Sequence, residues 1–596
     1  MCAKVNNKNE LKNSLGIPGF TGRVLSGLTM KVAGWGKFNE VYKHISQYEG
    51  VEFAAKLIEY LGITINLNEE ALANIPKEGA VIFTANHPFG ALDGMAALSV
   101  LGKVRPDLKI FTNLILSKIP NTKENFIAST TTYGFGKFEA GSISGYRAAE
   151  EHLSKGGALV LFPAGEVSTY NTQGKVVEDK QWYILLARQI RKSKAPVIPV
   201  YFHGHNSKYF QFLSKISTKL SDLRVTHEML DKKGEVIKMR VGSVINTQEL
   251  EKQKDDRAVA HYLRSRSYML EANVEEKDKS FYTTEVIPPV DVNLILKELE
   301  DNYERDHLFD VGETSCYLFD KQNIPNLMRE IARKREEAFR AVGEGTNLTM
   351  DTDSYDDYYK QLILWNTKEK ALVGAYRLGM GQEILKTKGI HGFYADMLFR
   401  YNDTEEARQL LSKCVELGRS FVSVEHQKDT LALMLLFKGL LHTMMRYQEY
   451  RYLIGPVSIS SWYPMLYRSL MVHYLREHHC TPGYKNLVNP VHPFVPDFGR
   501  VDVNALLYGK TTNLEMFDRF LLRMSGGQYR LPALVKKYIK LGAKIIDYNV
   551  DPDFHDCLDG LILLALEDMP TDEVDTLSKD FADRTPVYRR FYGANL

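Results

Sequence analysis

Hydrophobic and polar positions along the first half of the chain predict short strands that alternate with helices. The runs AVIFTA, ALVLF and VIPVYF are apolar and strand-like, and the helical patterns MAALSVLG and QWYILLARQI lie between them. This alternation predicts an α/β domain, in which functional side chains gather at the ends of strands.

The second half predicts a mixed α/β domain of a different kind. Its strand-like runs are TSCYLF, LILWN, KALVGAYRLG and YLIGPVSI, and its helical patterns are IPNLMREIARKREEAFRAV, EEARQLLSKCVELGRSFV and DTLALMLLFKGLLHTMM. A charged stretch before Pro288-Pro289 is typical of a linker. We therefore place the first domain at residues 51–285 and the second at residues 305–596, after an N-terminal segment at residues 1–50.

The N-terminal segment is basic and amphipathic. Val24, Leu28, Val32 and Trp35 would form one stripe of a helix, and basic residues outnumber acidic ones around it. This pattern suits a helix on an anionic membrane surface, and it equally suits a helix that packs on the domain core. We expect no secretory signal, and the longest apolar runs fall short of the roughly 18–20 residues that span a bilayer.

Composition narrows the functional classes. The 596 residues suffice for more than one domain, and 76 basic side chains against 74 acidic ones argue against bulk binding of nucleic acid. The five cysteines are scattered, which fits a reducing cytoplasm and gives no metal-binding spacing. His473, His478, His479 and Cys480 predict a solvated helix end, so we expect no metal.

A histidine and an aspartate follow the strand AVIFTA. His87 comes directly after Asn86, and Asp93 lies at the start of the next predicted helix. His87 would take the proton of a substrate hydroxyl that attacks an acyl thioester, while Asp93 orients its ring. The alternative is a structural histidine with satisfied hydrogen bonds.

A second loop, Phe162-Pro163-Ala164-Gly165-Glu166, follows the strand ALVLF. Gly165 would let the backbone approach a ligand closely, and Glu166 would hold a hydroxyl or amine of the acceptor. Together with Val197-Ile198-Pro199-Val200, these blocks resemble the glycerolipid acyltransferase family, the lysophosphatidic-acid acyltransferases and their relatives, over about residues 70–250. The resemblance implies acyl transfer from a thioester to a hydroxyl, with substrate contacts at Asn86, Phe162, Pro163, Gly165 and Glu166.

Departures from that family bear on the acceptor. The spacing from His87 to Asp93 is one residue longer than the family's usual spacing, and Ala164 stands where glutamate is usual. The arginine with which the family binds phosphate after this glycine is also missing. Because an arginine fork is the natural partner of a phosphate, we expect a phosphorus-free acceptor, and the chain looks more like the subgroup that completes aminolipids.

A second set of residues recurs in order in the other half, namely Arg335, Phe339, Asp353, Asp356, Arg377, Glu416 and Arg419. We expect Glu416 and Arg419 to pair on one face of a helix, and such a pair alone is usually a weak surface interaction. The order of the whole set resembles the acyl-homoserine-lactone synthases and, more closely, the ornithine-lipid type N-acyltransferases, over about residues 310–570. That resemblance implies a GNAT-like fold, the fold of acetyltransferases.

By the same resemblance, Glu416 takes the proton of an amino acid's amine through water. Arg377 and Arg419 would order the acidic turn or hold carrier and substrate, with Arg335, Phe339, Asp353 and Asp356 completing the site. The glycine-rich coenzyme A loop is not evident, because Arg377-Leu378-Gly379-Met380-Gly381 has the wrong spacing. We therefore expect acyl carrier protein as the donor, with acyl-coenzyme A as the alternative and no bound cofactor.

The two halves together predict a bifunctional aminolipid synthase of the bacterial cytoplasm, attached peripherally to the inner membrane. The second domain would N-acylate an amino acid such as ornithine or glycine with a 3-hydroxyacyl chain, and the first would O-acylate the resulting hydroxyl. The alternatives are a lysophospholipid acyltransferase with an accessory GNAT-like domain, and a non-enzymatic membrane protein that binds lipid and carrier protein. The expected partners are acyl carrier protein, lipid and amino-acid substrates and a membrane surface, without nucleic acid.

Overall fold

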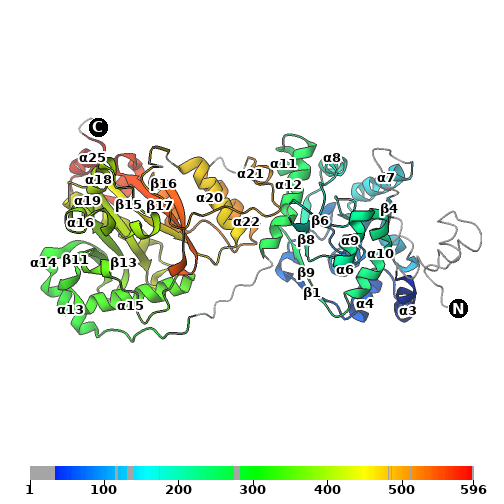
Figure 1. The fold of residues 1–596 in the computed structure, drawn as a ribbon, viewed down its shortest axis with the longest axis horizontal. Coiled ribbons are helices and arrows are strands. Elements are labelled where there is room, and N and C mark those ends of the chain that lie inside the picture. Colours follow the sequence, from blue (N-terminus) through cyan, green and yellow to red (C-terminus); the bar gives the residue numbers. More distant parts are fainter. Residues whose placement is uncertain are drawn as a thin grey trace, which may run out of the picture. The chain divides into compact units, whose positions relative to one another are not determined.

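Figure 1 shows the computed structural model, which describes residues 34–113, 119–129, 140–173, 175–273, 282–480, 482–484, 486–509 and 513–593. Its contacts divide the chain into two compact units. The first unit contains Met1–Glu276 and Phe498–Arg530, and the second contains Lys277–Asp497 and Leu531–Leu596. The expected second domain, residues 305–596, is therefore interrupted by a segment that joins the first unit.

A seven-stranded sheet forms the centre of the first unit, in the order β1-β9-β8-β2-β5-β3-β4. Neighbouring strands run parallel, except for the antiparallel pair β8 and β9. The strands are β1 Thr64–Leu67, β2 Val81–Ala85, β3 Lys109–Asn113, β4 Phe126–Ser129, β5 Ala158–Leu161, β8 Val197–His203 and β9 Val236–Val241, beside a small hairpin of β6 Thr169–Asn171 and β7 Val176–Glu178. The α/β prediction for this half is confirmed.

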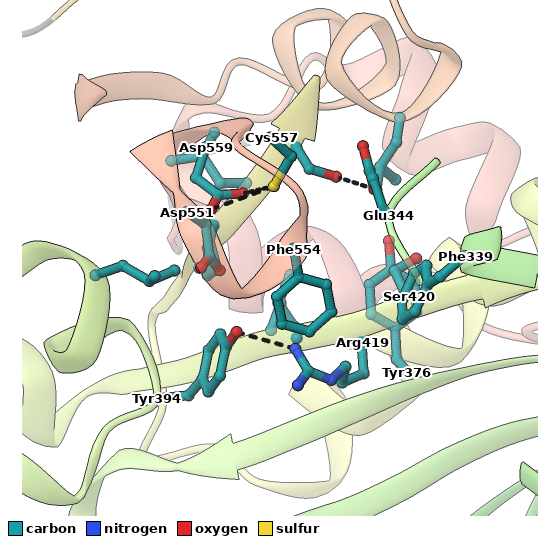
Figure 2. A pocket seen from close by; sticks show the side chains of 18 of the residues that line it. Phe339, Glu344, Tyr376, Tyr394, Arg419, Ser420, Asp551, Phe554, Cys557 and Asp559 are labelled. Atoms are coloured by element: carbon teal, nitrogen blue, oxygen red, sulfur yellow. Dashed lines mark hydrogen bonds between the residues drawn. The ribbon is translucent and has the colours of Figure 1, made fainter. Parts of the chain in front are cut away.

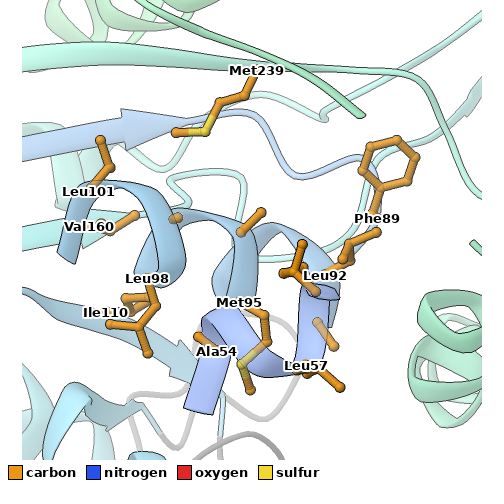
Figure 3. Close-up of a cluster of buried hydrophobic side chains, with 14 of the residues drawn as sticks. Ala54, Leu57, Phe89, Leu92, Met95, Leu98, Leu101, Ile110, Val160 and Met239 are labelled. Atoms are coloured by element: carbon orange, nitrogen blue, oxygen red, sulfur yellow. The ribbon is translucent and has the colours of Figure 1, made fainter. Parts of the chain in front are cut away.

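Helices cover this sheet and bury its apolar side chains. On one face, Ala54 and Leu57 of α4 meet Leu92, Met95 and Leu98 of α6, as Figure 3 shows. The helices are α3 Trp35–Ile45, α4 Gly50–Tyr60, α5 Glu69–Leu72, α6 Ala91–Val104, α7 Ala140–Ser154, α8 Ile184–Ser193, α9 Lys208–Ile216, α10 Thr218–Asp231, α11 Thr247–Glu251 and α12 Asp256–Tyr268, with the 3-10 turns η2 Pro120–Asn125 and η3 Met269–Asn273.

The described end of the N-terminal segment packs on the core of this unit. In α3, Trp35 and Phe38 are buried and their rings meet edge to face at 5.6 Å. Of the two alternatives for this segment, Trp35 therefore shows the one in which the helix packs on the domain core. The other members of the predicted stripe, Val24, Leu28 and Val32, lie outside the described residues.

The segment Phe498–Arg530 lies against the first unit, and we call it the strap. It contains α21 Val503–Leu507 and α22 Leu514–Met524. Arg500 donates hydrogen bonds to the Tyr201 hydroxyl at 2.8 Å and to the Glu271 carboxylate, and its guanidinium lies 4.8 Å from the Tyr268 ring. The strap is thus fixed by a largely buried cation and its partners.

The second unit is built on an eight-stranded sheet in the order β10-β11-β12-β13-β14-β15-β17-β16. All neighbours are antiparallel except β14 and β15, which are parallel. The strands are β10 His307–Val311, β11 Thr314–Asp320, β12 Lys360–Asn366, β13 Ala371–Met380, β14 Cys414–Val422, β15 Tyr452–Ile459, β16 Lys544–Asp551 and β17 Cys557–Ala565. This mixed architecture confirms the prediction for the second half.

The helices of the second unit pack along the sheet and at its ends. They are α13 Val292–Asp301, α14 Tyr303–Asp306, α15 Pro325–Val342, α16 Gly381–Thr387, α17 Ala395–Phe399, α18 Glu405–Ser412, α19 Thr430–Arg446, α20 Met465–His479, α23 Ala533–Lys540, α24 Thr571–Leu577 and α25 Thr585–Tyr592. Short 3-10 turns are η4 Lys321–Asn323, η5 Ser354–Asp357, η6 Ile390–Gly392, η7 Val424–His426, η8 Pro482–Tyr484, η9 Pro552–Phe554 and η10 Leu566–Asp568. Among the described residues, no helix is both long and apolar enough to cross a membrane.

One predicted helix is wrong in its second half. The run EEARQLLSKCVELGRSFV forms α18 only to Ser412 and then becomes the strand β14. Glu416 and Arg419 therefore lie on a strand, and they do not share a helix face. Strand pairing on both sides of β14 outweighs the helical propensity of its leucine, glutamate and arginine residues.

Removal of the Arg500 side chain should destabilise the first unit. An Arg500→Ala variant leaves the Glu271 carboxylate and the Tyr201 hydroxyl without this donor, at a cost of about 2–3 kcal/mol of unfolding free energy. Calorimetric unfolding of the full chain measures the effect. Arg519→Ala is the matched control, because Arg519 is exposed on the same strap and donates to the Glu515 carbonyl of its own helix. Equal stability of the two variants would contradict the anchoring role of Arg500.

Candidate active sites

The first site lies where β2 ends. His87 follows that strand, and its Nδ1 lies 3.0 Å from Oδ2 of Asp93, in the first turn of α6. The same carboxylate oxygen accepts hydrogen bonds from the amides of Phe89 at 2.9 Å and Gly90 at 2.8 Å. Asp93 is fully buried, and this burial raises the pKa of its carboxyl, against the opposing effects of His87 and the two amides. The longer spacing between His87 and Asp93 thus forms a turn that is closed by the hydrogen bonds to the Asp93 carboxylate.

The second loop adjoins the histidine. The ring of Phe162 stacks on the His87 ring with centroids 4.1 Å apart. The Ser168 amide donates to the His87 carbonyl at 2.8 Å. The structure thereby brings the two predicted motifs together at the carboxyl ends of the parallel strands β2 and β5.

Asn86 and Gly165 have structural contacts that the sequence did not reveal. The Asn86 side chain exchanges two hydrogen bonds with the backbone of Phe202, at 2.9 and 2.7 Å, and so ties β2 to β8. Gly165 has a φ of +69°, and a Cβ there would lie 2.4 Å from the Tyr183 ring. Glycine at this position leaves room for that ring. Substrate contacts at Asn86 and Gly165 stay predictions.

Asp179 links the His87 segment to the loop from Phe162 through hydrogen bonds, and the sequence did not predict it. Its Oδ1 accepts from the His87 amide at 3.1 Å and from the Ser168 hydroxyl at 2.5 Å, and its Oδ2 accepts from the Trp182 indole at 2.9 Å. The Asp179 amide donates to the Tyr268 hydroxyl at 2.7 Å. Because Arg500 lies over the Tyr268 ring, this chain of contacts joins the strap to the His87 loop. No local motif marks Asp179 in the sequence.

Two further acids border the first site. Glu166 pairs with Lys180 at 2.7 Å, so the nearby lysine is already neutralised. Burial raises the pKa of Asp222 to about 6, Glu166 adds to the rise, and His87 opposes it. Asp222 was not predicted, because it lies on α10, far along the sequence from both motifs.

The second site opens where β14 and β15 separate. Their parallel pairing covers only Cys414↔Tyr452, Val415↔Leu453 and Glu416↔Ile454, although both strands continue. Pro456 has no amide hydrogen to pair, which fits the loss of pairing there. A pocket lies between the separated strands, and it is lined on them by Leu417, Gly418, Arg419, Ser420, Gly455, Pro456 and Ser458.

A buried ionic network supports one wall of this pocket. Arg377 is fully buried and pairs with Asp353 at 2.5 Å and with Asp356 at 3.3 Å, while Arg335 pairs with Asp356 at 3.3 Å. Burial alone would raise the pKa of Asp356, but Arg335 and Arg377 outweigh it and lower that pKa to about 2. The predicted set thus comes together, with Arg335, Arg377 and Asp356 buried behind the pocket.

Arg419 and Phe339 are the members of the predicted set that line the pocket itself. Arg419 has a φ of +49° beside a register shift between β13 and β14. It pairs with Asp351 at 3.0 Å and Asp353 at 3.2 Å, and it donates to the Tyr394 hydroxyl at 3.0 Å. Figure 2 shows Arg419 and Tyr394 beside the Phe554 ring.

Glu416 is enclosed by donors. Its carboxylate accepts from the Tyr359 hydroxyl and from the amides of Tyr394 at 2.9 Å and Ala395 at 2.8 Å. Burial raises its pKa, against these hydrogen bonds. Glu416 is not among the described residues that line the pocket, so its role as a base stays a prediction.

Comparison with known proteins follows this division of the chain. Residues 12–277 match the family model described as acyltransferase, and residues 335–437 match the acetyltransferase (GNAT) domain. A glycine N(alpha)-acyltransferase of Bacteroides thetaiotaomicron is 30% identical over 301 residues, which are 48% of this chain and 88% of that protein. The chain belongs to the family of this acyltransferase.

Two further relatives are O-acyltransferases. A lyso-glycine lipid O-acyltransferase of the same species is 26% identical over 229 residues, covering 37% of this chain and 80% of the relative. The corresponding protein of Phocaeicola vulgatus is 24% identical over 241 residues, covering 39% and 83%. The chain is therefore an enzyme with two acyltransferase domains, and both resemblances expected from the sequence are confirmed.

Neutralising Asp356 should destabilise the GNAT unit strongly. Asp356→Asn leaves Arg335 and Arg377 buried without this partner, at a cost of about 3–5 kcal/mol. Because the folded-state pKa is about 2 and the usual value is about 3.9, this contribution is complete above about pH 4 and is lost as the pH falls toward 2. Unfolding in urea at pH 7 measures it. Asp357→Asn is the control, since Asp357 is exposed and pairs with Lys321; an equal loss there would refute the role of the network.

Proposed function

We propose that this enzyme makes a phosphorus-free glycine lipid in two acylations. The GNAT unit forms the amide of glycine with a 3-hydroxyacyl chain, and the first unit then esterifies the chain's hydroxyl. The observation that carries the proposal is the presence of two separate acyl-transfer sites on one chain. Fusion also keeps the one-chain intermediate at a high effective concentration for the second step.

The first site suits attack by a neutral lipid hydroxyl. With Nδ1 of His87 directed to Asp93, Nε2 is left to accept the hydroxyl proton as the oxygen attacks the thioester carbonyl. The loop from Phe162 carries no arginine, and its nearby cation Lys180 is paired with Glu166. The loop therefore offers no guanidinium to bind the phosphate of a phosphate-bearing acceptor. This supports a lyso-aminolipid as the acceptor.

The gap between β14 and β15 suits the donor of the first acylation. Strand edges that stop pairing expose amide and carbonyl groups, and a linear thioester arm with its own amides can pair with them. We propose acyl carrier protein as the donor. The wrong spacing after Arg377 for a coenzyme A loop supports this choice over acyl-coenzyme A.

We also propose that the first unit docks on the cytoplasmic face of the inner membrane through α9. Three apolar side chains on this helix are exposed, Tyr209 by 53%, Phe212 by 58% and Ile216 by 61%. Lys208 and Lys215 are exposed among them, which suits anionic headgroups. The Tyr170 amide, close behind the loop from Phe162, donates to Gln211 of α9 at 2.9 Å, so this face lies near the lipid site.

Lipid mass spectrometry of a heterologous host tests the two-step function. The wild-type protein should yield a two-chain glycine lipid, and His87→Gln should accumulate the one-chain form because the second acylation lacks its base. His203→Gln is the control, since His203 lies at the end of β8 in the same unit. Altered phospholipid acylation without a new aminolipid would instead identify a lysophospholipid acyltransferase and reject the proposal.

Vesicle flotation tests the docking face. A Phe212→Ser, Ile216→Ser double variant should bind vesicles of phosphatidylglycerol and phosphatidylethanolamine about tenfold or more weakly, because each side chain contributes roughly 1.5–3 kcal/mol when buried. Val236→Ser removes an equally exposed apolar side chain, 58%, from β9 and serves as the control. Unchanged binding of the double variant would exclude α9 as the contact.

A further inference from the structure

Three carboxyl groups line the pocket of the GNAT unit opposite Arg419. They belong to Glu344, just after α15, to Asp551, at the end of β16, and to Asp559, on β17. Figure 2 shows them with Cys557 on one side of the Phe554 ring, while Arg419 and Tyr394 lie on the other side. Each residue is at least nine-tenths buried.

These carboxyl groups have few partners of their own. Glu344 accepts a hydrogen bond from the Ser458 hydroxyl at 2.8 Å, and Asp551 accepts one from the Asp553 amide at 3.0 Å. The Asp559 carboxylate contacts the Cys557 thiol at 3.9 Å. None of the three forms an ion pair within the described part of the chain, whereas the buried Arg335 and Arg377 of the same unit both do.

A cluster of this kind attracts a cation, because buried carboxylates without an ion-pair partner are costly. Burial raises the pKa of Glu344 to about 7, with a smaller contribution from Asp551. Burial also raises the pKa values of Asp551 and Asp559, against the opposing effect of the Arg419 guanidinium. A carboxyl group that titrates near neutral pH is suited to take a proton and release it again.

We propose that Glu344, Asp551 and Asp559 bind the ammonium group of the acceptor amino acid, and that Glu344 is the base that deprotonates it. The inference rests on the proposed N-acylation and names its amine site. Glu344 lines the pocket, whereas the carboxylate of Glu416 already accepts hydrogen bonds from three donors.

The proton balance of the step is simple. Glu344 removes one proton from the ammonium, and the free amine attacks the thioester carbonyl. The C–N bond forms and the C–S bond breaks with its electron pair on sulfur. The second proton from nitrogen goes to the departing thiolate, so amide and thiol are the products, and Glu344 returns its proton to solvent.

A metal ion is the competing occupant of part of this cluster. The ligand atoms of Asp551, Cys557 and Asp559 lie within 4.8 Å of one another. Burial raises the pKa of Cys557, whose thiol donates to Asp559, and a metal ion would have to displace that proton. The proposed reaction itself supplies an ammonium, and the metal dependence of activity distinguishes the two occupants.

Steady-state N-acylation of glycine by the full-length protein, with 3-hydroxyacyl-loaded acyl carrier protein as donor, tests the inference. Glu344→Gln keeps the acceptor for Ser458 and should lower kcat by about 10²–10⁴-fold. Asp559→Asn should raise the KM for glycine more than tenfold. Asp556→Asn is the matched control, because Asp556 is exposed next to Cys557, and it should retain wild-type rates.

The outcomes separate the base from its alternatives. Wild-type kcat in Glu344→Gln, or a loss confined to Glu416→Gln, would overturn the inference; so would activity that EDTA abolishes and Zn²⁺ restores. If Glu344→Gln unfolds, as judged by its melting temperature, the Asp559→Asn variant decides through KM. A wild-type protein that acylates no amino acid refutes the proposed function itself, which is a different result from a normal rate in the variant.

Discussion

A charge that leaves water needs an opposite charge or several donors, since an unpaired buried ion costs several kcal/mol. In the second unit, Arg335 and Arg377 are buried and Arg419 is largely buried, and the acidic turn from Asp351 to Asp356 supplies their partners. The turn is thereby bound to α15, β13 and β14 together. Because Arg419 belongs both to this network and to the pocket, the shape of the GNAT site depends on these pairs.

The same requirement is met differently in the first unit. Asp93 and Asp179 are buried, and each accepts hydrogen bonds from backbone amides of the segment that carries His87. These acids fix the position of the histidine backbone and ring. In the GNAT pocket, by contrast, Glu344 and Asp559 have weak or single partners, which leaves their charge available to a substrate.

Much of the fold follows from local sequence pattern, because strands and helices with strong periodicity depend on their own residues. The strand before His87, the turn to Asp93 and the loop from Phe162 were all predictable in this way. The strand β14 was not, since the helical propensity of VELGR is overridden by pairing with β13 and β15. Glu344, Asp551 and Asp559 come from three distant segments, and no local pattern indicates that they meet. Asp179 could not be predicted for the same reason.

The strap has a consequence for how the protein is made. Domains begin to fold in order as the chain leaves the ribosome, at about 5–20 residues per second. The first unit is translated early, yet its contacts through Arg500 require a segment that lies beyond most of the second unit. Its final packing must therefore wait until residue 530 has emerged. A ribosome that stops between the two halves releases the O-acyltransferase unit without its strap. This unit can therefore complete its packing only after most of the N-acyltransferase unit has also been synthesised.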